Sequence, residues 1–190
     1  MVLENEKCCV EIKADYAYYA CTLESTDNHY DVILNPFDYK RNEKVKTLSI
    51  HVDLFEKEFH LALLGPFYIY DDNCAVLEDE TLSVLQGSVI TQIGITDGTI
   101  IRHIWLNCFD DDFCAMYFAI YRINNGYVLL AETEITMVDL DFNKKWSFSG
   151  KGIFASFSGK HFLEISNNSI CLYDFEKNYY EIDFNGNLLR

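Results

Sequence analysis

Thr47-Leu-Ser-Ile-His-Val-Asp-Leu54 gives the clearest signal for the fold class, because its apolar and polar residues alternate strictly. The even-numbered residues are all Leu, Ile or Val, and the odd-numbered residues are Thr, Ser, His and Asp. Successive side chains of a β-strand point to opposite faces, so this period of two predicts a strand with one buried face.

The same period recurs along most of the chain and predicts further strands. They are Cys8–Ile12, Tyr16–Leu23, Tyr30–Leu34, Phe59–Leu64, Phe67–Tyr70, Val89–Ile95, Thr99–Leu106, Phe113–Ile123 and Tyr127–Ala131. Asp97-Gly98 and Asn125-Gly126 supply positive φ at little cost, so they predict antiparallel hairpins over 89–106 and 113–131. Helix signals are few. Asp53–Glu56 reads as a capping box and Leu77–Leu85 as one or two helical turns, although both also read as strand ends.

The C-terminal third contains an internal repeat of the form apolar–Asp–apolar, two residues, Asn. The three copies are Val138-Asp-Leu-Asp-Phe-Asn143, Tyr173-Asp-Phe-Glu-Lys-Asn178 and Ile182-Asp-Phe-Asn-Gly-Asn187. An Asp or Asn side chain at a strand end satisfies backbone N–H groups as the chain reverses, so each copy predicts a turn. The wide separation of the first two copies suits several short strands, and the short separation of the last two suits adjacent strands of one hairpin.

Residues 127–190 resemble a blade of a β-propeller of the quinoprotein-like type. In those repeats a strand ending in an aspartate precedes a tight turn and then an aromatic position, as in Ile135–Trp146 here. The second copy departs from the pattern, with Tyr179-Tyr180 after its turn. The resemblance implies blade-like hairpins. A closed ring needs at least about four blades of four strands, which a chain of 190 residues barely supplies.

The composition also favours β structure. Thirteen Tyr and fourteen Phe stand against two Pro, and the apolar fraction of 49% is enough for a core. We therefore predict an all-β fold of antiparallel meander sheets, as a β-sandwich or propeller-like blades, with at most one or two short helices. We expect a single domain over residues 1–190, with the blade-like region at about 127–190.

Location follows from the cysteines and the N-terminal segment. The seven cysteines are an odd set without regular spacing, which is typical of reduced thiols rather than of a disulfide framework. Met1–Lys7 lacks the cationic and apolar regions of a secretory signal, and no apolar run approaches about 20 residues. We expect a cytoplasmic protein that does not enter membranes.

Motifs for metal binding or catalysis are weak. Asp139-x-Asp141-x-Asn143 matches the first half of a calcium loop, but Lys144 and Gly150 stand where the turn glycine and the bidentate Glu belong. Zinc-ligand spacing, a nucleophile elbow and a glycine-rich phosphate loop are missing from the sequence. We expect no cofactor, no metal site and no catalytic residues. An enzyme with carboxylates or a Cys–His pair assembled in space stays an open alternative.

The strongest functional signal is an acidic block. Residues 58–121 carry ten carboxylates and one cation, Arg102, and so hold −9 of the formal net charge of −15. Aromatic residues interleave with the acids, as at the cores and rims of protein interfaces. The candidate partner-binding residues are Tyr70, Asp71, Asp72, Glu78, Asp79, Glu80, Phe109, Asp110, Asp111 and Asp112.

Size, charge and the lack of a catalytic motif resemble the immunity proteins of bacterial contact-dependent inhibition and polymorphic toxin systems. The resemblance implies a toxin inhibitor that binds a basic partner, a nuclease domain, and blocks its active site. Direct binding to nucleic acid is disfavoured, because no stretch clusters enough Lys and Arg to neutralise phosphates.

Two alternatives to the toxin inhibitor stay open. In the first, the acidic residues only form a solubilising face. In the second, the chain is a β-rich ligand- or peptide-binding module without catalysis, in which Trp146, Tyr179 and Tyr180 stack on a sugar or bind a peptide.

Overall fold

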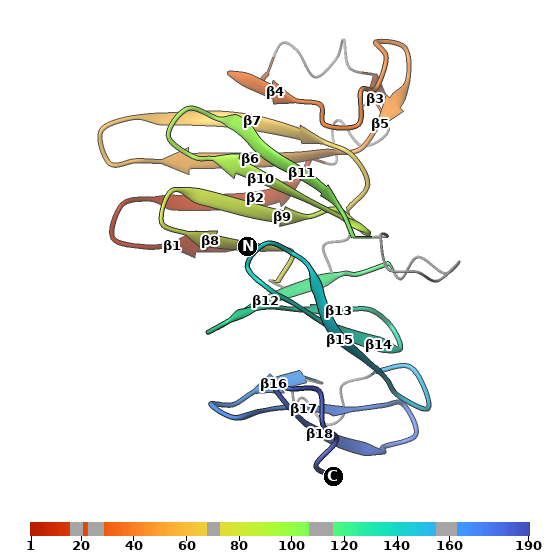
Figure 1. The fold of residues 1–190 in the computed structure, drawn as a ribbon. Coiled ribbons are helices and arrows are strands. Elements are labelled where there is room, and N and C mark those ends of the chain that lie inside the picture. The colour runs from red at the N-terminus through yellow and green to blue at the C-terminus, as the bar shows by residue number, and fades with distance from the viewer. Residues whose placement is uncertain (16–20, 23–28, 68–72, 107–115, 155–162) are drawn as a thin grey trace. The chain divides into compact units, whose positions relative to one another are not determined.

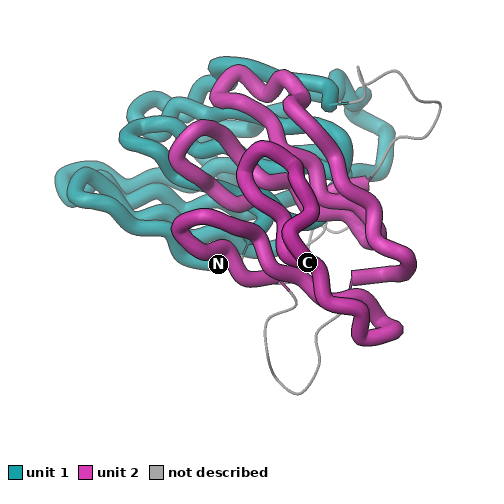
Figure 2. Tube along the Cα trace, turned by 60° about the horizontal axis from the view of Figure 1, so that its bottom comes forward, with its two compact units in different colours: residues 1–110, 118–120 teal, residues 111–117, 121–190 magenta. Residues whose placement is uncertain are grey.

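A computed structural model describes residues 1–15, 21–22, 29–67, 73–106, 116–154 and 163–190, with residues 21 and 22 described by their backbone alone. In these ranges every regular element is a β-strand, and eighteen strands form five sheets (Figure 1). The all-β prediction is therefore confirmed. The chain forms two compact units (Figure 2): unit 1 comprises residues 1–110 and 118–120, and unit 2 comprises residues 111–117 and 121–190. The expected single domain stays a prediction.

Unit 1 contains three sheets. Its strands are β1 (Val2–Glu4), β2 (Cys9–Ala14), β3 (Cys21–Thr22), β4 (Val32–Leu34), β5 (Lys44–Val45), β6 (Thr47–Asp53), β7 (Glu58–Leu64), β8 (Ala75–Glu78), β9 (Thr81–Leu85), β10 (Val89–Gly94) and β11 (Thr99–Trp105). The sheet orders are β1-β2-β6-β7-β4, β11-β10-β9-β8 and β3-β5. The pairing of β4 with β7 is parallel, which the meander prediction did not include.

The alternation in β6 produces the predicted buried face. Leu48, Ile50 and Val52 are completely buried, whereas Ser49 and His51 are only half-buried. The buried side chains join one core cluster that extends over both large sheets of unit 1. The period of two in the sequence therefore fixes which face of β6 points into the core.

Unit 2 contains two sheets. Its strands are β12 (Ala119–Ile123), whose first two residues are assigned to unit 1, β13 (Gly126–Leu130), β14 (Glu134–Val138), β15 (Lys144–Ser149), β16 (Leu163–Ile165), β17 (Ser169–Tyr173) and β18 (Tyr179–Asp183). The sheet orders are β12-β13-β14-β15 and β16-β17-β18, so consecutive strands are neighbours, as expected for meanders. All five residues of β13 are buried, which explains why this strand reads as a continuous apolar run.

Both predicted hairpins form. β10 and β11 pair across the turn that contains Gly98 (φ +68°), and β12 and β13 are neighbours across Asn124-Asn125. The start of the predicted 113–123 strand lies partly outside the described residues, and the strand itself begins at Ala119.

The two helix signals are wrong, and the strand-end readings of the same segments are confirmed. Asp53–Glu56 is the end of β6 and the turn that follows it. Leu77–Leu85 is the β8–β9 hairpin, in which Leu82, Val84 and Leu85 are all buried. β9 is covered on both faces, since Ser83 is buried as well, and the spacing of Leu82 and Leu85 fits a helix as well as a strand.

The predicted turn repeat of unit 2 is confirmed with the same geometry in 139–143, 174–178 and 183–187. In each, the first Asp accepts the backbone N–H of the fifth residue, at 2.9, 2.9 and 2.8 Å. The side-chain amide of the fifth residue, Asn, returns to the carboxylate at 3.3, 2.8 and 2.9 Å. The fourth residue has φ of +64°, +67° and +86°. Asp and Asn therefore close a five-residue turn, as their side-chain chemistry predicts.

A fourth turn of this kind lies in unit 1 at residues 35–39, where Asn stands in place of the first Asp. Asn35 Oδ1 accepts the backbone N–H of Tyr39 at 3.0 Å, and Asp38 has φ of +56°. The sequence comparison missed it because the first residue is Asn and the fifth is Tyr.

Candidate functional site

One end of unit 1 gathers four turns from two sheets (left in Figure 1). In the five-stranded sheet, Cys9 pairs with Asp53, which places the β1–β2 turn beside the β6–β7 turn. In the four-stranded sheet, Thr81 pairs with both Glu78 and Gly94, so the β8–β9 and β10–β11 turns lie at one end. We call residues 4–7, 53–58, 78–80 and 95–98 the loop-end surface.

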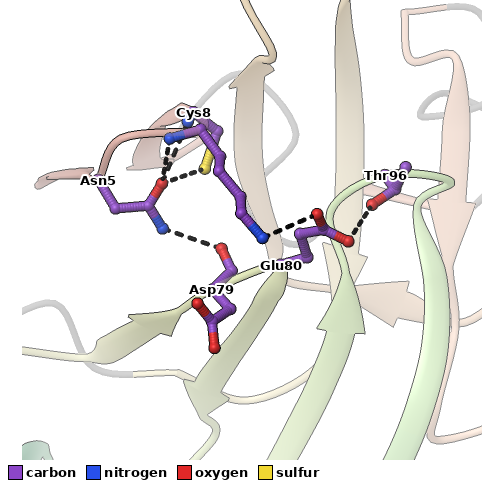
Figure 3. A network of polar contacts seen from close by, with 6 residues as sticks. Asn5, Cys8, Asp79, Glu80 and Thr96 are labelled. Atoms are coloured by element: carbon purple, nitrogen blue, oxygen red, sulfur yellow. Dashed lines mark hydrogen bonds and ion pairs between the residues drawn. The ribbon is translucent and has the colours of Figure 1, made fainter.

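Direct contacts join three of these turns (Figure 3). Asn5 Nδ2 donates to the backbone oxygen of Asp79 at 2.9 Å, and Lys7 Nζ lies 3.2 Å from Glu80 Oε1. Glu80 also accepts the hydroxyl of Thr96 at 3.4 Å. The two large sheets of unit 1 are therefore held together at this end by polar contacts.

Gly98 and Asp97 bring the β10–β11 turn against β7. A Cβ at Gly98 would stand 2.8 Å from Leu61 Cδ2, so the close approach of this turn requires glycine. Asp97 accepts the hydroxyl and the N–H of Thr99 at 2.7 and 3.0 Å, and these hydrogen bonds lower the pKa of its carboxyl below the usual value. Asp97 is therefore an anion at neutral pH.

The loop-end surface is strongly anionic. It carries nine carboxylates and two ammonium groups, which gives a formal charge of −7 out of −15 for the chain. The acids are Glu4, Glu6, Asp53, Glu56, Glu58, Glu78, Asp79, Glu80 and Asp97, and the bases are Lys7 and Lys57. Nearly half of the net charge of the chain is therefore gathered at one end of unit 1.

Three of the candidate partner-binding residues lie in this surface: Glu78, Asp79 and Glu80. Asp79 is exposed with φ of +50°, and its carboxylate points away from the network that its backbone oxygen joins (Figure 3). The other candidates lie outside the described residues: Tyr70, Asp71, Asp72, Phe109, Asp110, Asp111 and Asp112. The partner-binding role of all ten stays a prediction.

Sequence reasoning missed the contribution of the first 57 residues to this surface. Glu4, Glu6, Asp53 and Glu56 lie outside the acidic block, and strand pairing brings them to the same end as the block. The local sequence carries no signal for this, because the juxtaposition depends on which sheets share an end.

Phe55 is an exposed apolar residue within the loop-end surface. Its side chain is 64% exposed, and its φ is +67°. Asp53 Oδ1 accepts the N–H of Phe55 at 2.8 Å, and Leu54 N–H donates to the oxygen of Lys57 at 2.9 Å. Because Leu54 packs against the core, the turn points Leu54 inward and Phe55 toward solvent.

The calcium-like motif in unit 2 has the contacts of a structural turn. Asp139 Oδ2 lies 2.8 Å from Lys145 Nζ, and Asp139 Oδ1 accepts the N–H groups of Asp141 and Asn143. These contacts, that of Lys145 first, lower the pKa of Asp139 to about 2. Across the described ranges, no three His, Cys, Asp or Glu side chains are grouped to hold a metal ion.

Two of the three aromatic residues considered for ligand stacking serve the packing of unit 2. Trp146 is half-buried, and its indole N–H donates to the oxygen of Phe184 at 3.1 Å. Tyr180 is buried with its ring against Phe148 and Phe154. Tyr179 is half-buried, and its hydroxyl donates to Cys171 Sγ at 3.2 Å.

In unit 1, outside the loop-end surface, an aromatic cluster lies around β11. Phe37 meets the rings of His103 and Trp105 edge-on, with centroid distances of 4.9 and 6.0 Å. Trp105 is 53% exposed. Through Phe37, the exposed indole of Trp105 and the ring of His103 therefore belong to one group of contacting rings.

His103 ends a buried chain of hydrogen bonds. Gln86 Nε2 donates to the oxygen of Leu64 at 3.1 Å, and Gln86 Oε1 accepts the hydroxyl of Thr91 at 2.7 Å. Thr91 Oγ1 therefore accepts the proton of His103 Nδ1, at 3.1 Å. His103 Nε2 is left as a bare acceptor, buried without a hydrogen-bond partner in the described part of the chain.

This arrangement predicts an acid-sensitive unit 1. Burial lowers the pKa of His103 below its usual 6.5, because removal from water disfavours the charged imidazolium. Because the pKa is depressed in the folded state, the contribution of neutral His103 to the stability of unit 1 is complete above about pH 6.5. It is lost as the pH falls from this value through the lower, folded pKa. In a Trp146→Phe background, fluorescence of Trp105 during urea unfolding at pH 7.5 and pH 5.5 should show a smaller pH effect for His103→Asn than for the parent. Equal pH effects in the two proteins would contradict this assignment.

Comparisons with known proteins give no identity for this chain. No family model and no curated protein matches the chain. Among solved structures, the chain is similar to Hsv2 of Kluyvelomyces marxianus, with 11% identity and a TM-score of 0.43 over 76% of this chain and 46% of the other. It is also similar to BamB from Moraxella catarrhalis, with 8% identity and a TM-score of 0.37 over 78% of this chain and 58% of the other. The chain thus spans about half the length of these two structures, and likenesses at this level carry no functional argument.

The described residues contain no helix that is long and apolar enough to cross a membrane.

Proposed function

We propose that this protein captures a basic protein partner through the loop-end surface. The supporting observation is the gathering of nine carboxylates against two lysines on four turns of unit 1. A surface of one charge sign steers an oppositely charged partner and raises the association rate constant by roughly 10- to 1000-fold. The loop-end surface combines this charge with an exposed aromatic side chain, Phe55, of the type that anchors interfaces.

More specifically, we propose that the chain is an immunity protein that acts in the cytoplasm on a basic bacterial toxin nuclease. The carboxylates would take the place of nucleic-acid phosphates against the Lys and Arg of the toxin, and so block entry of the substrate. The size of the chain, its net charge of −15 and the lack of a catalytic motif in the sequence support this form.

The test is the association of the protein with the basic toxin nuclease encoded beside it, at about 0.15 M salt, where charges more than roughly 8 Å apart are screened. A triple variant carries Glu6→Lys, Glu56→Lys and Asp79→Lys. All three side chains are exposed and form no ion pair with any other described residue. We expect the association rate constant of this variant, measured by stopped flow, to fall by roughly 10- to 1000-fold.

A matched control separates a local effect from a change in net charge. Glu132→Lys, Glu164→Lys and Glu176→Lys change the total charge by the same amount in unit 2, again at exposed positions. A fall that is equal in the two triple variants would contradict the loop-end surface as the binding site. The lack of any complex at this salt concentration would contradict the immunity form.

A second candidate function, peptide binding without catalysis, is favoured by the exposed Trp105 on the edge strand β11. An extended peptide would add a strand to this edge and lay side chains on the ring. In that case a bound peptide should shift the fluorescence of Trp105, and its affinity for the loop-end triple variant should equal its affinity for the parent.

A further inference from the structure

Phe55 adopts a backbone conformation that a bulky residue rarely takes. Its φ of +67° lies in the left-handed region, which costs an L-residue other than glycine roughly 1–2 kcal/mol. Asn or Gly in the same turn would avoid most of this cost, because both tolerate positive φ. The β6–β7 turn therefore has no conformational reason to carry Phe.

Phe142 shows how folding normally offsets this cost. It has nearly the same φ, +64°, but it is only 3% exposed, and its ring stacks on Tyr127 with a centroid distance of 4.8 Å. Full burial of such a side chain contributes about 1.5–3 kcal/mol, which exceeds the cost of the backbone. Phe55 is 64% exposed and makes no ring contact with another described residue, so folding gains little from its ring.

The surroundings of Phe55 define the chemistry of an occupant. Asp53, Glu56 and Glu58 belong to the same turn region, and Lys57 is the one cation among them. In protein interfaces, the residues that dominate affinity are aromatic side chains that fill a pocket inside a polar rim. A partner that covers this turn must therefore offer an apolar pocket to the ring and positive charges to the rim.

We propose that Phe55 is the apolar anchor of the loop-end surface and that its partner is a basic protein surface with an apolar pocket rimmed by Lys and Arg. This inference rests on the proposed function, since it assigns the chemistry of the partner at the same surface. It also separates two roles: the carboxylates set the rate of encounter and its salt dependence, and Phe55 sets the lifetime of the complex.

Two synthetic peptides of equal positive charge test the anchor. One contains only Lys, Gly and Ser, and the other is an amphipathic Lys–Leu helix with an apolar face flanked by lysines. Phe55→Asn removes the ring and suits the positive φ of the turn. Phe175→Asn removes another exposed ring, 72% exposed and in unit 2, and is the matched control. Affinities are measured by calorimetry at low salt, and ¹⁵N chemical shifts of residues 53–58 locate the binding.

The Lys–Leu peptide should bind at least about tenfold tighter than the Lys–Ser peptide, and Phe55→Asn should remove this excess. The same variant should leave the affinity of the Lys–Ser peptide unchanged, and its Tm should be equal to or above that of the parent. An excess that survives Phe55→Asn, or that Phe175→Asn removes equally, overturns the anchor and leaves the electrostatic proposal standing. A fall in Tm of several degrees for Phe55→Asn would show that the ring serves folding and also overturns the anchor. If neither peptide binds, the proposed function itself is contradicted.

Discussion

Gly126→Ala is expected to destabilise unit 2 by at least about 3 kcal/mol. Gly126 is the first residue of β13 and has φ of +156°, a conformation that L side chains rarely adopt. A Cβ at this position would stand 2.0 Å from the oxygen of Val138 and 2.9 Å from the Cα of Asp139. Both atoms belong to the backbone, so no side-chain rearrangement relieves the clash, and the β13–β14 pairing must break or shift.

The measurement is urea unfolding followed by tryptophan fluorescence. The chain has two Trp, so a Trp105→Phe background leaves Trp146 on β15 as the reporter of unit 2. Gly152→Ala is the control, because a Cβ there meets its nearest atoms at 3.8–3.9 Å, an ordinary contact. We expect the control to lie within about 1 kcal/mol of the parent. A Gly126→Ala variant as stable as this control would show that the close approach of β13 and β14 is not as described.

Asp174→Asn should lower the Tm of unit 2 by at least about 5 °C. Asp174 is completely buried, and its carboxylate accepts the N–H and the side-chain amide of Asn178 at 2.9 and 2.8 Å and the hydroxyl of Tyr180 at 2.7 Å. The Tyr180 oxygen in turn accepts the N–H of Lys151 at 3.0 Å. An amide at residue 174 cannot accept all of these donors at once, and a buried donor without an acceptor destabilises the fold.

Asp183→Asn is the matched control, because Asp183 closes the same five-residue turn in a more exposed position. Its loss should be smaller than that of Asp174→Asn. Equal losses would show that the buried network of Asp174 adds nothing to the turn.

The same network predicts a pH dependence. Burial raises the pKa of Asp174, but the hydrogen bonds from Asn178 and Tyr180 outweigh burial and lower it below 3.8. A depressed carboxyl pKa gives stability that is complete above about pH 3.8 and is lost as the pH falls through the lower, folded value. The Tm difference between the parent and Asp174→Asn should therefore be largest near neutral pH and shrink toward pH 2.

The strands that the sequence predicts well are those buried on one face. The β6 pattern is local, because the polarity of each residue of Thr47–Asp53 indicates on which face of the strand that residue lies. β9 and β13 bury nearly every residue. In the sequence, residues 77–85 read both as helical turns and as strand ends, and Tyr127–Ala131 reads as a strand that follows the turn dipeptide Asn125-Gly126. The parallel pairing of β4 and β7 depends on the path of the chain and has no local signal.

The candidate site could likewise be predicted only in part. The sequence identifies Glu78–Glu80 as candidate binding residues, since charge is a property of each residue. It does not predict that Asn5 and Lys7 contact their turn, because this requires two sheets to share an end. In the sequence, Phe55 reads as part of a capping box or of a strand end. Its exposure and positive φ belong to the turn rather than to the residue type.

Binding of a cationic partner to the loop-end surface can be located by ¹⁵N chemical-shift mapping with the basic toxin nuclease as the titrant. We expect the largest perturbations in the four turns at residues 4–7, 53–58, 78–80 and 95–98, and we expect added salt to weaken them together. Perturbations confined to unit 2 or to the Trp105 region of β11, with these four turns unchanged, would contradict binding at this surface.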